Sequence, residues 1–292
     1  MSGKRNFDMT VIASNSAALR AQNGSRMANN ELQTAMARLS SGNRINSAAD
    51  DAAGLAISNS MTSQINGMNQ AISNANDGIS LAQTADGALN EVTNMLQRVR
   101  ELAVQSASGT YSDDDRTNMQ AEATQLSSQI NSILTDTKFN NTTVFTTTGT
   151  AAAAIKIQTG SNNGDTVTIT PSDVSSLVTN ATKVGTGTPA VTGYDISSQT
   201  NASSTLDTLD ADLKTVATAR ANLGASESQL NSVVNNLTNN VTNLTDAKSR
   251  ISDADFSAET TNLAKAQILN QAATAMLAQA NQSQQGVLKL LQ

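Results

Sequence analysis

The chain has 292 residues, a formal net charge of −6 and only six aromatic side chains, four Phe and two Tyr. It contains neither Cys nor His, which excludes thiolate and imidazole catalysis and almost all zinc sites. The acidic balance argues against a nucleic-acid or anionic-membrane partner, and no stretch approaches the roughly 20 apolar residues of a membrane span. We therefore expect slender helical packing around aliphatic side chains, with no enzyme activity, no cofactor and no metal site.

The first predicted helix is a weakly apolar segment near the N-terminus. Apolar residues recur at helical spacing between Leu32 and Leu39, and Gly42 follows as a typical helix terminator. The segment before them is too thinly apolar to stabilise a long helix alone, so it should need another surface to fold. Residues 10–19 are too polar for the core of a signal peptide. The chain should therefore stay in the cytosol or leave by a route that reads no such signal.

A regular apolar seam follows. From Ile65 to Val99, apolar positions recur in steps of three and four residues, which is the pattern of one face of a long helix. Ser112 and Asp115 fit a capping box and predict the start of another helix, with a shorter apolar face at residues 126–133.

Two acidic clusters are the candidates for a metal or a catalytic carboxylate pair. They are Asp50 with Asp51, and residues 113–115. Neither has the spacing of a calcium loop, and nothing in the sequence suggests a cleft around them. We interpret both as helix caps or surface carboxylates.

The middle of the chain is rich in Thr and holds the two proline residues, Pro171 and Pro189. Residues 155–158 and 167–169 alternate apolar and polar side chains around a Gly/Asn turn, which predicts a β-hairpin. A phosphate-binding loop at residues 160–165 is disfavoured, because the Lys-Ser/Thr ending and the following helix are missing. This section is too polar and too short for much core of its own, so we expect a small appendage or surface loops.

The strongest pattern is a heptad seam of fourteen positions from Leu206 to Ile251, eleven of them apolar. It predicts a helix of about 46 residues, roughly 70 Å long. Arg220, Glu227 and Lys248 interrupt the seam, and each would face its own copy in a parallel dimer. We therefore favour pairing with the earlier seam of the same chain, and a parallel coiled-coil oligomer is the alternative.

The C-terminal residues 263–291 favour a helix but are thinly apolar, like the N-terminal segment. Neither end buries enough surface to stabilise a long helix by itself. Both ends should therefore be disordered until something supplies the missing apolar face.

Several ordered stretches resemble bacterial flagellins. The N-terminal signature of that family is similar to RLSSGNRINSAADDAAGLAI at residues 38–57, and its C-terminal signature is similar to SRISDADF at residues 249–256. The similarity covers about residues 9–145 and 200–292 and leaves only the middle section uncovered. Further similar stretches are residues 74–90, 97–106 and 265–272.

Together with the periodicities, the resemblance implies a mainly α fold: a long antiparallel helical rod with paired terminal helices and a small central insert that contains the β-hairpin. It implies that residues 1–48 and 255–292 form an inner terminal helical domain. Residues 49–145 and 200–254 would form a rod domain, and residues 146–199 a short variable outer insert.

The resemblance also implies a structural subunit that self-assembles into the helical filament of the bacterial flagellum, used for motility. The filament is extracellular, and subunits are exported through the flagellar type III apparatus without a cleaved signal peptide. Implied partners are other flagellin subunits, the flagellar cap, hook-associated proteins and an export chaperone. The side chains expected to pack between subunits are Leu32, Leu39, Arg44, Ile45, Ile268, Leu269, Leu277, Leu290 and Leu291.

A charged group in the second half of the first seam has two interpretations. From residue chemistry alone, Arg98 and Arg100 with Glu101 form a solvated helix face, and a recognition patch is the alternative. In flagellins sensed by Toll-like receptor 5, however, matching positions contact the receptor. The resemblance therefore implies a recognition role for Gln97, Arg98, Leu102 and Glu122.

Two alternative functions stay open at this point. A hook–filament junction protein shares the terminal helices, and it would form short capped arrays instead of long filaments. A surface adhesin that borrowed flagellin ends would need a larger insert with aromatic or charged pockets, and Tyr194 is the one aromatic residue in this insert.

Overall fold

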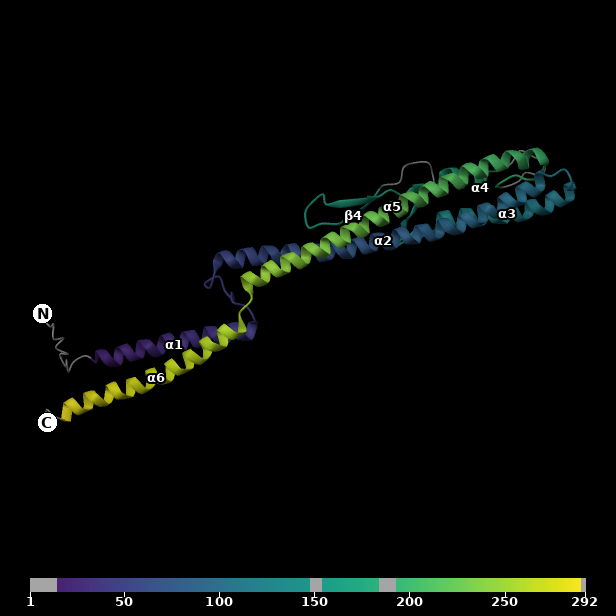
Figure 1. Cartoon of the computed structure of the whole chain (residues 1–292). Coiled ribbons are helices and arrows are strands. Elements are labelled where there is room, and N and C mark those ends of the chain that lie inside the picture. Colours follow the sequence, from purple (N-terminus) through teal and green to yellow (C-terminus); the bar gives the residue numbers. More distant parts are fainter. Residues whose placement is uncertain (1–14, 148–153, 184–192, 290–292) are drawn as a thin grey trace. The chain divides into compact units, whose positions relative to one another are not determined.

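The computed structural model describes residues 15–147, 154–183 and 193–289 (Figure 1). Leu290 and Leu291, two of the expected packing residues, lie outside these ranges, as does Pro189. The helices within them are α1 (Ser16–Ser41), α2 (Ala52–Ala107), α3 (Asp113–Asp136), α4 (Ser175–Thr182), α5 (Gln199–Ser252) and α6 (Phe256–Lys289). The strands are β1 (Lys138–Phe139), β2 (Thr142–Thr143), β3 (Phe145–Thr146), β4 (Ile155–Gln158), β5 (Thr166–Ile169) and β6 (Ser172–Asp173).

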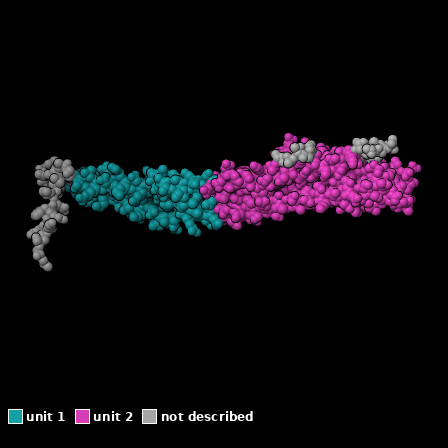
Figure 2. Space-filling view, turned by 90° about the horizontal axis from the view of Figure 1, so that it is seen from above, with its two compact units in different colours: residues 1–63, 243–292 teal, residues 64–242 magenta. Residues whose placement is uncertain are grey.

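The mainly α fold class, with a β-hairpin in the middle of the chain, is confirmed. The chain forms two compact units, Met1–Ser63 with Asn243–Gln292, and Gln64–Thr242 (Figure 2). We call them unit 1 and unit 2. The predicted division into inner, rod and outer parts concerns places in an assembly and stays a prediction.

In unit 1, α1 and α6 lie side by side and antiparallel (Figure 1). At one end, the Asn15 side chain donates a hydrogen bond to the carbonyl of Ala280 (3.1 Å), and at the other the Arg38 guanidinium lies 3.8 Å from the Glu259 carboxylate. The sequence predicted that both chain ends need another apolar surface. Each helix supplies part of that surface to the other.

The chain leaves α1 at Gly42, whose φ of 71° is a left-handed conformation that glycine adopts without steric cost. The next residues pair with the segment after α5. The N–H of Arg44 donates to the carbonyl of Ser252 (2.6 Å), and the N–H of Ala254 donates to the carbonyl of Gly42 (2.9 Å). These bonds fix the start of α6 against the end of α1.

In unit 2, α2 and α5 pack antiparallel along the two predicted seams. Two charged interruptions of the α5 seam find partners on α2: the Arg220 guanidinium lies 2.7 Å from the Asp86 carboxylate, and Gln83 donates to Glu227 (2.9 Å). The seams are thus paired within one chain, as predicted. The largest fully buried side chains along this interface include Leu89, Val92, Leu96, Val99, Leu209 and Leu230.

Helix α3 begins with the predicted capping box. The Ser112 hydroxyl accepts a hydrogen bond from the N–H of Asp115 (3.3 Å), and the Asp115 carboxylate accepts one from the N–H of Ser112 (3.1 Å). The helix adds Ile130 and Leu134 to the core of unit 2.

The middle section contains the predicted hairpin, because β4 and β5 pair antiparallel with Ile155 opposite Ile169. The described part of this section has no separate core of its own, and its apolar residues instead join the core of the long helices. The few apolar side chains of this section can be buried because they pack against apolar side chains of the long helices. The section buries Val167, Ile169, Val174, Leu177 and Ile196 in the same cluster as α2, α3 and α5.

Candidate assembly and recognition surfaces

Helix α6 leaves large apolar side chains exposed. Ile268 is 65% exposed, Met276 63% and Leu269 43%. Between α1 and α6 lies a groove of about 760 Å³, which Met27 of α1 lines together with Leu269 and Met276 of α6. Three large apolar groups in water are unfavourable, so this face is suited to being covered by another surface.

The residues expected to pack between subunits do not all lie on such a face. Ile268 and Leu269 are exposed, and Leu32, Leu39 and Leu277 are half-buried. Arg44 is exposed, and its guanidinium donates to the carbonyl of Ile251 (2.6 Å).

Ile45 is only 6% exposed, so it belongs to the interior of unit 1. Its Cδ1 atom lies so close to Gly54 that a Cβ built there would approach it at 2.8 Å. A side chain at position 54 would therefore displace Ile45, and a neighbouring subunit cannot reach Ile45 while this packing is intact.

In the described structure the acidic residues of both clusters are helix caps or exposed turn carboxylates. The Asp50 carboxylate accepts hydrogen bonds from the N–H groups of Ser47 (2.8 Å) and Asn46 (3.1 Å), which lower its pKa, with Ser47 the larger cause. Asp51 accepts the N–H of Gly54 (2.8 Å) at the start of α2. Among the described residues, no cluster of three or more acidic side chains is arranged to hold a metal ion. No described helix has the length and hydropathy to cross a membrane.

The expected recognition residues separate into exposed and buried groups. The Arg98 guanidinium, about half exposed, donates to Glu122 (2.8 Å) and to Glu101 (3.0 Å). These hydrogen bonds raise the pKa of Arg98, with that to Glu122 the larger cause. Gln97 is exposed, whereas Leu102 is buried in the core of unit 2. The structure therefore brings Arg98 and Glu122 together on the surface and keeps Leu102 away from it.

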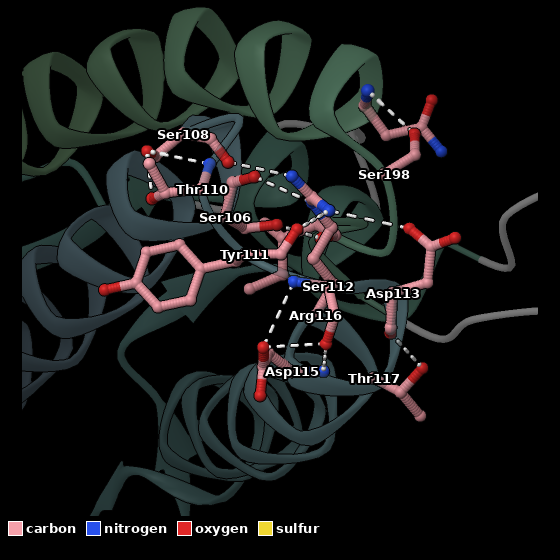
Figure 3. Close-up of polar contacts among 12 residues, drawn as sticks. Ser106, Ser108, Thr110, Tyr111, Ser112, Asp113, Asp115, Arg116, Thr117 and Ser198 are labelled. Carbon is pink, nitrogen blue, oxygen red and sulfur yellow. Dashed lines mark hydrogen bonds and ion pairs between the residues drawn. The ribbon is translucent and has the colours of Figure 1, made fainter.

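Sequence reasoning missed a buried arginine at the turn between α2 and α3 (Figure 3). Arg116 is only 6% exposed. Its guanidinium donates to the backbone carbonyls of Ser106 (2.9 Å), Ser108 (2.8 Å) and Tyr111 (2.7 Å). It thus satisfies carbonyls that the end of α2 and the turn would otherwise leave without partners.

A second buried polar group was also missed. Asp212 of α5 accepts a hydrogen bond from the Tyr194 hydroxyl (2.7 Å) and two from the Asn180 amide (2.9 and 3.1 Å). Burial raises the pKa of Asp212, and burial and the nearby carboxylate raise the pKa of Tyr194, which keeps its proton and remains a donor. The three residues tie α4 and the segment before α5 to α5 itself.

The Asp212 carboxyl should leave a signature in the pH dependence of stability. Its folded pKa is raised above the ordinary value of 3.8, so its contribution to stability is complete below that value and declines as pH rises through the folded pKa. We expect the free energy of unfolding of wild type relative to Asp212→Asn to fall as pH rises from about 4. Urea unfolding of both proteins across this range measures the difference. A difference that is independent of pH would contradict the assignment.

Comparison with known proteins shows to which family this chain is similar. Residues 12–150 match the bacterial flagellin N-terminal helical region, and residues 206–291 match the bacterial flagellin C-terminal helical region. A flagellin of Halalkalibacterium halodurans is 43% identical over 283 residues, covering 96% of this chain and 99% of that protein. The flagellar filament 33 kDa core protein of Treponema phagedenis is 40% identical over 295 residues, covering 96% of this chain and 99% of that protein.

A solved structure of a provisionally assigned flagellar hook-associated protein from Vibrio parahaemolyticus has a TM-score of 0.56. It is 15% identical and covers 70% of this chain and 100% of that one, so the likeness concerns the fold alone.

Paired helical seams and terminal helices with uncovered apolar faces define a structural, self-packing helical protein. The chain belongs to the bacterial flagellin family. It is a structural subunit of the flagellar filament, which serves motility and is built by polymerisation with other flagellin subunits. The family consists of filament proteins and not of enzymes.

Proposed function

We propose that this subunit joins the filament chiefly through α1 and α6. The observation that carries the proposal is the exposed apolar face of α6, formed by Ile268, Leu269 and Met276. Leu32, Leu39, Arg44 and Leu277 would add contacts at its edges, as would Leu290 and Leu291, which lie outside the described residues. The test is whether monomer with a polar α6 face still extends filament seeds. Undiminished growth would contradict the proposal.

We propose further that residues 1–48 and 255–292 form the inner part of the filament, residues 49–145 and 200–254 the surrounding rod, and residues 146–199 the outer part. The support is chemical: the exposed apolar side chains of unit 1 gain most from burial, while the middle section is rich in Thr. Hydrogen exchange on intact filaments tests this order. Faster exchange in α6 than in the β4–β5 hairpin would contradict it.

The family resemblance also supports export through the flagellar type III apparatus without a cleaved signal peptide, and an extracellular filament. The cap, hook-associated proteins and an export chaperone would bind the same terminal helices, because these carry the uncovered apolar faces. Copurification of these proteins with wild type, and its loss with the polar α6 face, is the corresponding measurement.

A second function, recognition by Toll-like receptor 5, is favoured by the geometry around Arg98. The proposed contacts are Gln97, Arg98 and Glu122; Leu102 would act only by supporting the helix from the core. Two carboxylates hold the Arg98 guanidinium at the surface, which lowers the entropy that a partner must remove on binding.

Arg98→Ala should reduce the response of receptor-expressing reporter cells to monomer by about tenfold or more, the effect of losing one charged interface anchor. Arg100→Ala is the matched control, since Arg100 is similarly exposed and pairs with Asp210 (2.8 Å). It should change the response little. Equal responses to wild type and Arg98→Ala would count against the receptor role.

A further inference from the structure

The sequence contains three Asn-Gly pairs, at Asn23, Asn66 and Asn163. All three Asn side chains are exposed to solvent. Asn23 lies inside α1 and Asn66 inside α2, whereas Asn163 lies in the turn between β4 and β5. The same Asn-Gly dipeptide therefore occurs both inside helices and in a turn.

The chemistry open to such a pair is spontaneous deamidation. The backbone nitrogen of the glycine attacks the side-chain Cγ of the asparagine, forming a C–N bond and expelling ammonia to leave a succinimide. One solvent water then opens the ring at either carbonyl and gives aspartate or isoaspartate. Glycine favours this route because it lacks a Cβ that would hinder the approach.

A helical backbone opposes the first step. In a helix interior the N–H of each residue is bonded to the carbonyl four residues earlier, and φ and ψ are fixed. Gly24 and Gly67, which follow Asn23 and Asn66, both lie inside helices. Their nitrogens are therefore held away from the preceding side chain until the helix opens locally.

The turn at Asn163 lacks these restraints. Gly164 has a φ of 96°, and a Cβ built on it would meet nothing within 4 Å. The residues beside the pair anchor the turn: the N–H of Asp165 donates to the carbonyl of Asn162 (3.3 Å), and the N–H of Thr159 donates to the carbonyl of Asp165 (2.8 Å). Within the described part of the chain, neither the Asn163 side chain nor the Gly164 N–H forms a hydrogen bond.

We propose that Asn163 is a site of spontaneous deamidation in the folded protein, and that the helices protect Asn23 and Asn66. Either product places a new carboxylate close to Asp165, whose own carboxylate already accepts hydrogen bonds from Asn162 (3.2 Å). Isoaspartate also adds a methylene to the main chain of the turn. Since the conversion is irreversible without a repair enzyme, the modified fraction records the age of the subunit.

The test is incubation of full-length protein in mildly alkaline buffer, followed by peptide mapping that separates asparagine, aspartate and isoaspartate. Asn163 should convert at least about tenfold faster than Asn66, the ratio that a modest difference in activation free energy produces. In concentrated urea, where no backbone is ordered, the two rates should approach each other. Equal rates in the folded protein, or an unchanged ratio in urea, would overturn the proposal.

Two substitutions give an independent readout. Asn163→Gln lengthens the side chain and disfavours ring closure, so the acidic charge variant that accumulates during incubation should disappear. Asn66→Gln is the matched control, because it removes an exposed Asn-Gly pair that lies inside α2, and it should leave that variant in place. Persistence of the acidic variant in Asn163→Gln would also overturn the proposal.

Discussion

Replacing Ile268, Leu269 and Met276 together by Ser should abolish seeded filament growth while the isolated subunit keeps its helices. Ile268 and Met276 are mostly exposed in the single subunit and Leu269 is 43% exposed, so their replacement removes only part of the packing of α6 against α1. Each would contribute about 1.5 kcal/mol or more when a neighbouring subunit covers it. Because about 1.4 kcal/mol is a factor of ten in an equilibrium constant, the critical concentration should rise roughly a thousandfold.

The matched control keeps an apolar face at the same positions, with Ile268→Val, Leu269→Met and Met276→Leu. This variant should extend seeds near the wild-type concentration, as measured by sedimentation and electron microscopy. Circular dichroism should be unchanged in both variants. Growth of the Ser variant at wild-type concentrations would show that subunits meet through another surface.

Arg116→Ala should lower the free energy of unfolding by about 3 kcal/mol, because it leaves the buried Ser106 carbonyl and the partly buried Ser108 and Tyr111 carbonyls without this donor. The guanidinium bonds three backbone carbonyls and is almost fully buried. The expected result is a lower urea midpoint with an unchanged slope, followed by circular dichroism. Arg116→Lys should recover only part of the loss, since a single ammonium lacks the fork that reaches all three acceptors.

Arg100→Ala is the control for removing a surface arginine. Arg100 pairs with Asp210, and both side chains are about half exposed, so its loss should barely move the midpoint. If Arg116→Ala and Arg100→Ala shift the urea midpoint equally, the hydrogen bonds of the buried guanidinium do not stabilise the α2–α3 turn.

Periodicity predicted the helices because their apolar faces repeat at the helical spacing. The seam of α5 is buried at Leu209, Leu223 and Leu237, and its charged interruption Arg220 pairs with Asp86. Local patterns of this kind depend only on neighbours in the sequence. The capping box and the β4–β5 hairpin were predictable for the same reason.

The buried polar groups were not predictable in this way. Arg116 sits in the first turn of α3, where exposed charges are ordinary, and its burial depends on how the preceding turn folds over it. Asp212 did carry a signal, since it lies three residues from Leu209 on the buried side of the seam. Its partners Tyr194 and Asn180 come from segments that no local pattern places beside α5.

The resemblance identified candidate contact positions but could not say which ones reach the surface. Ile45 and Leu102 match the family signatures, yet each is enclosed by its own subunit. The exposed fraction of a side chain depends on tertiary packing, which cannot be predicted from the order of residues in a motif.

The segment between α4 and Tyr194 has its two ends joined. The N–H of Gly193 donates to the carbonyl of Lys183 (2.7 Å), and the Tyr194 backbone carbonyl accepts a hydrogen bond from the Gln120 side chain (2.9 Å). These hydrogen bonds hold Lys183, Gly193 and Tyr194 in place at the edge of unit 2. Each doubling of a loop closed in this way costs only about 0.6 kcal/mol of chain entropy. A change in the number of residues between Lys183 and Gly193 is therefore expected to cost little stability, as long as these flanking hydrogen bonds are kept.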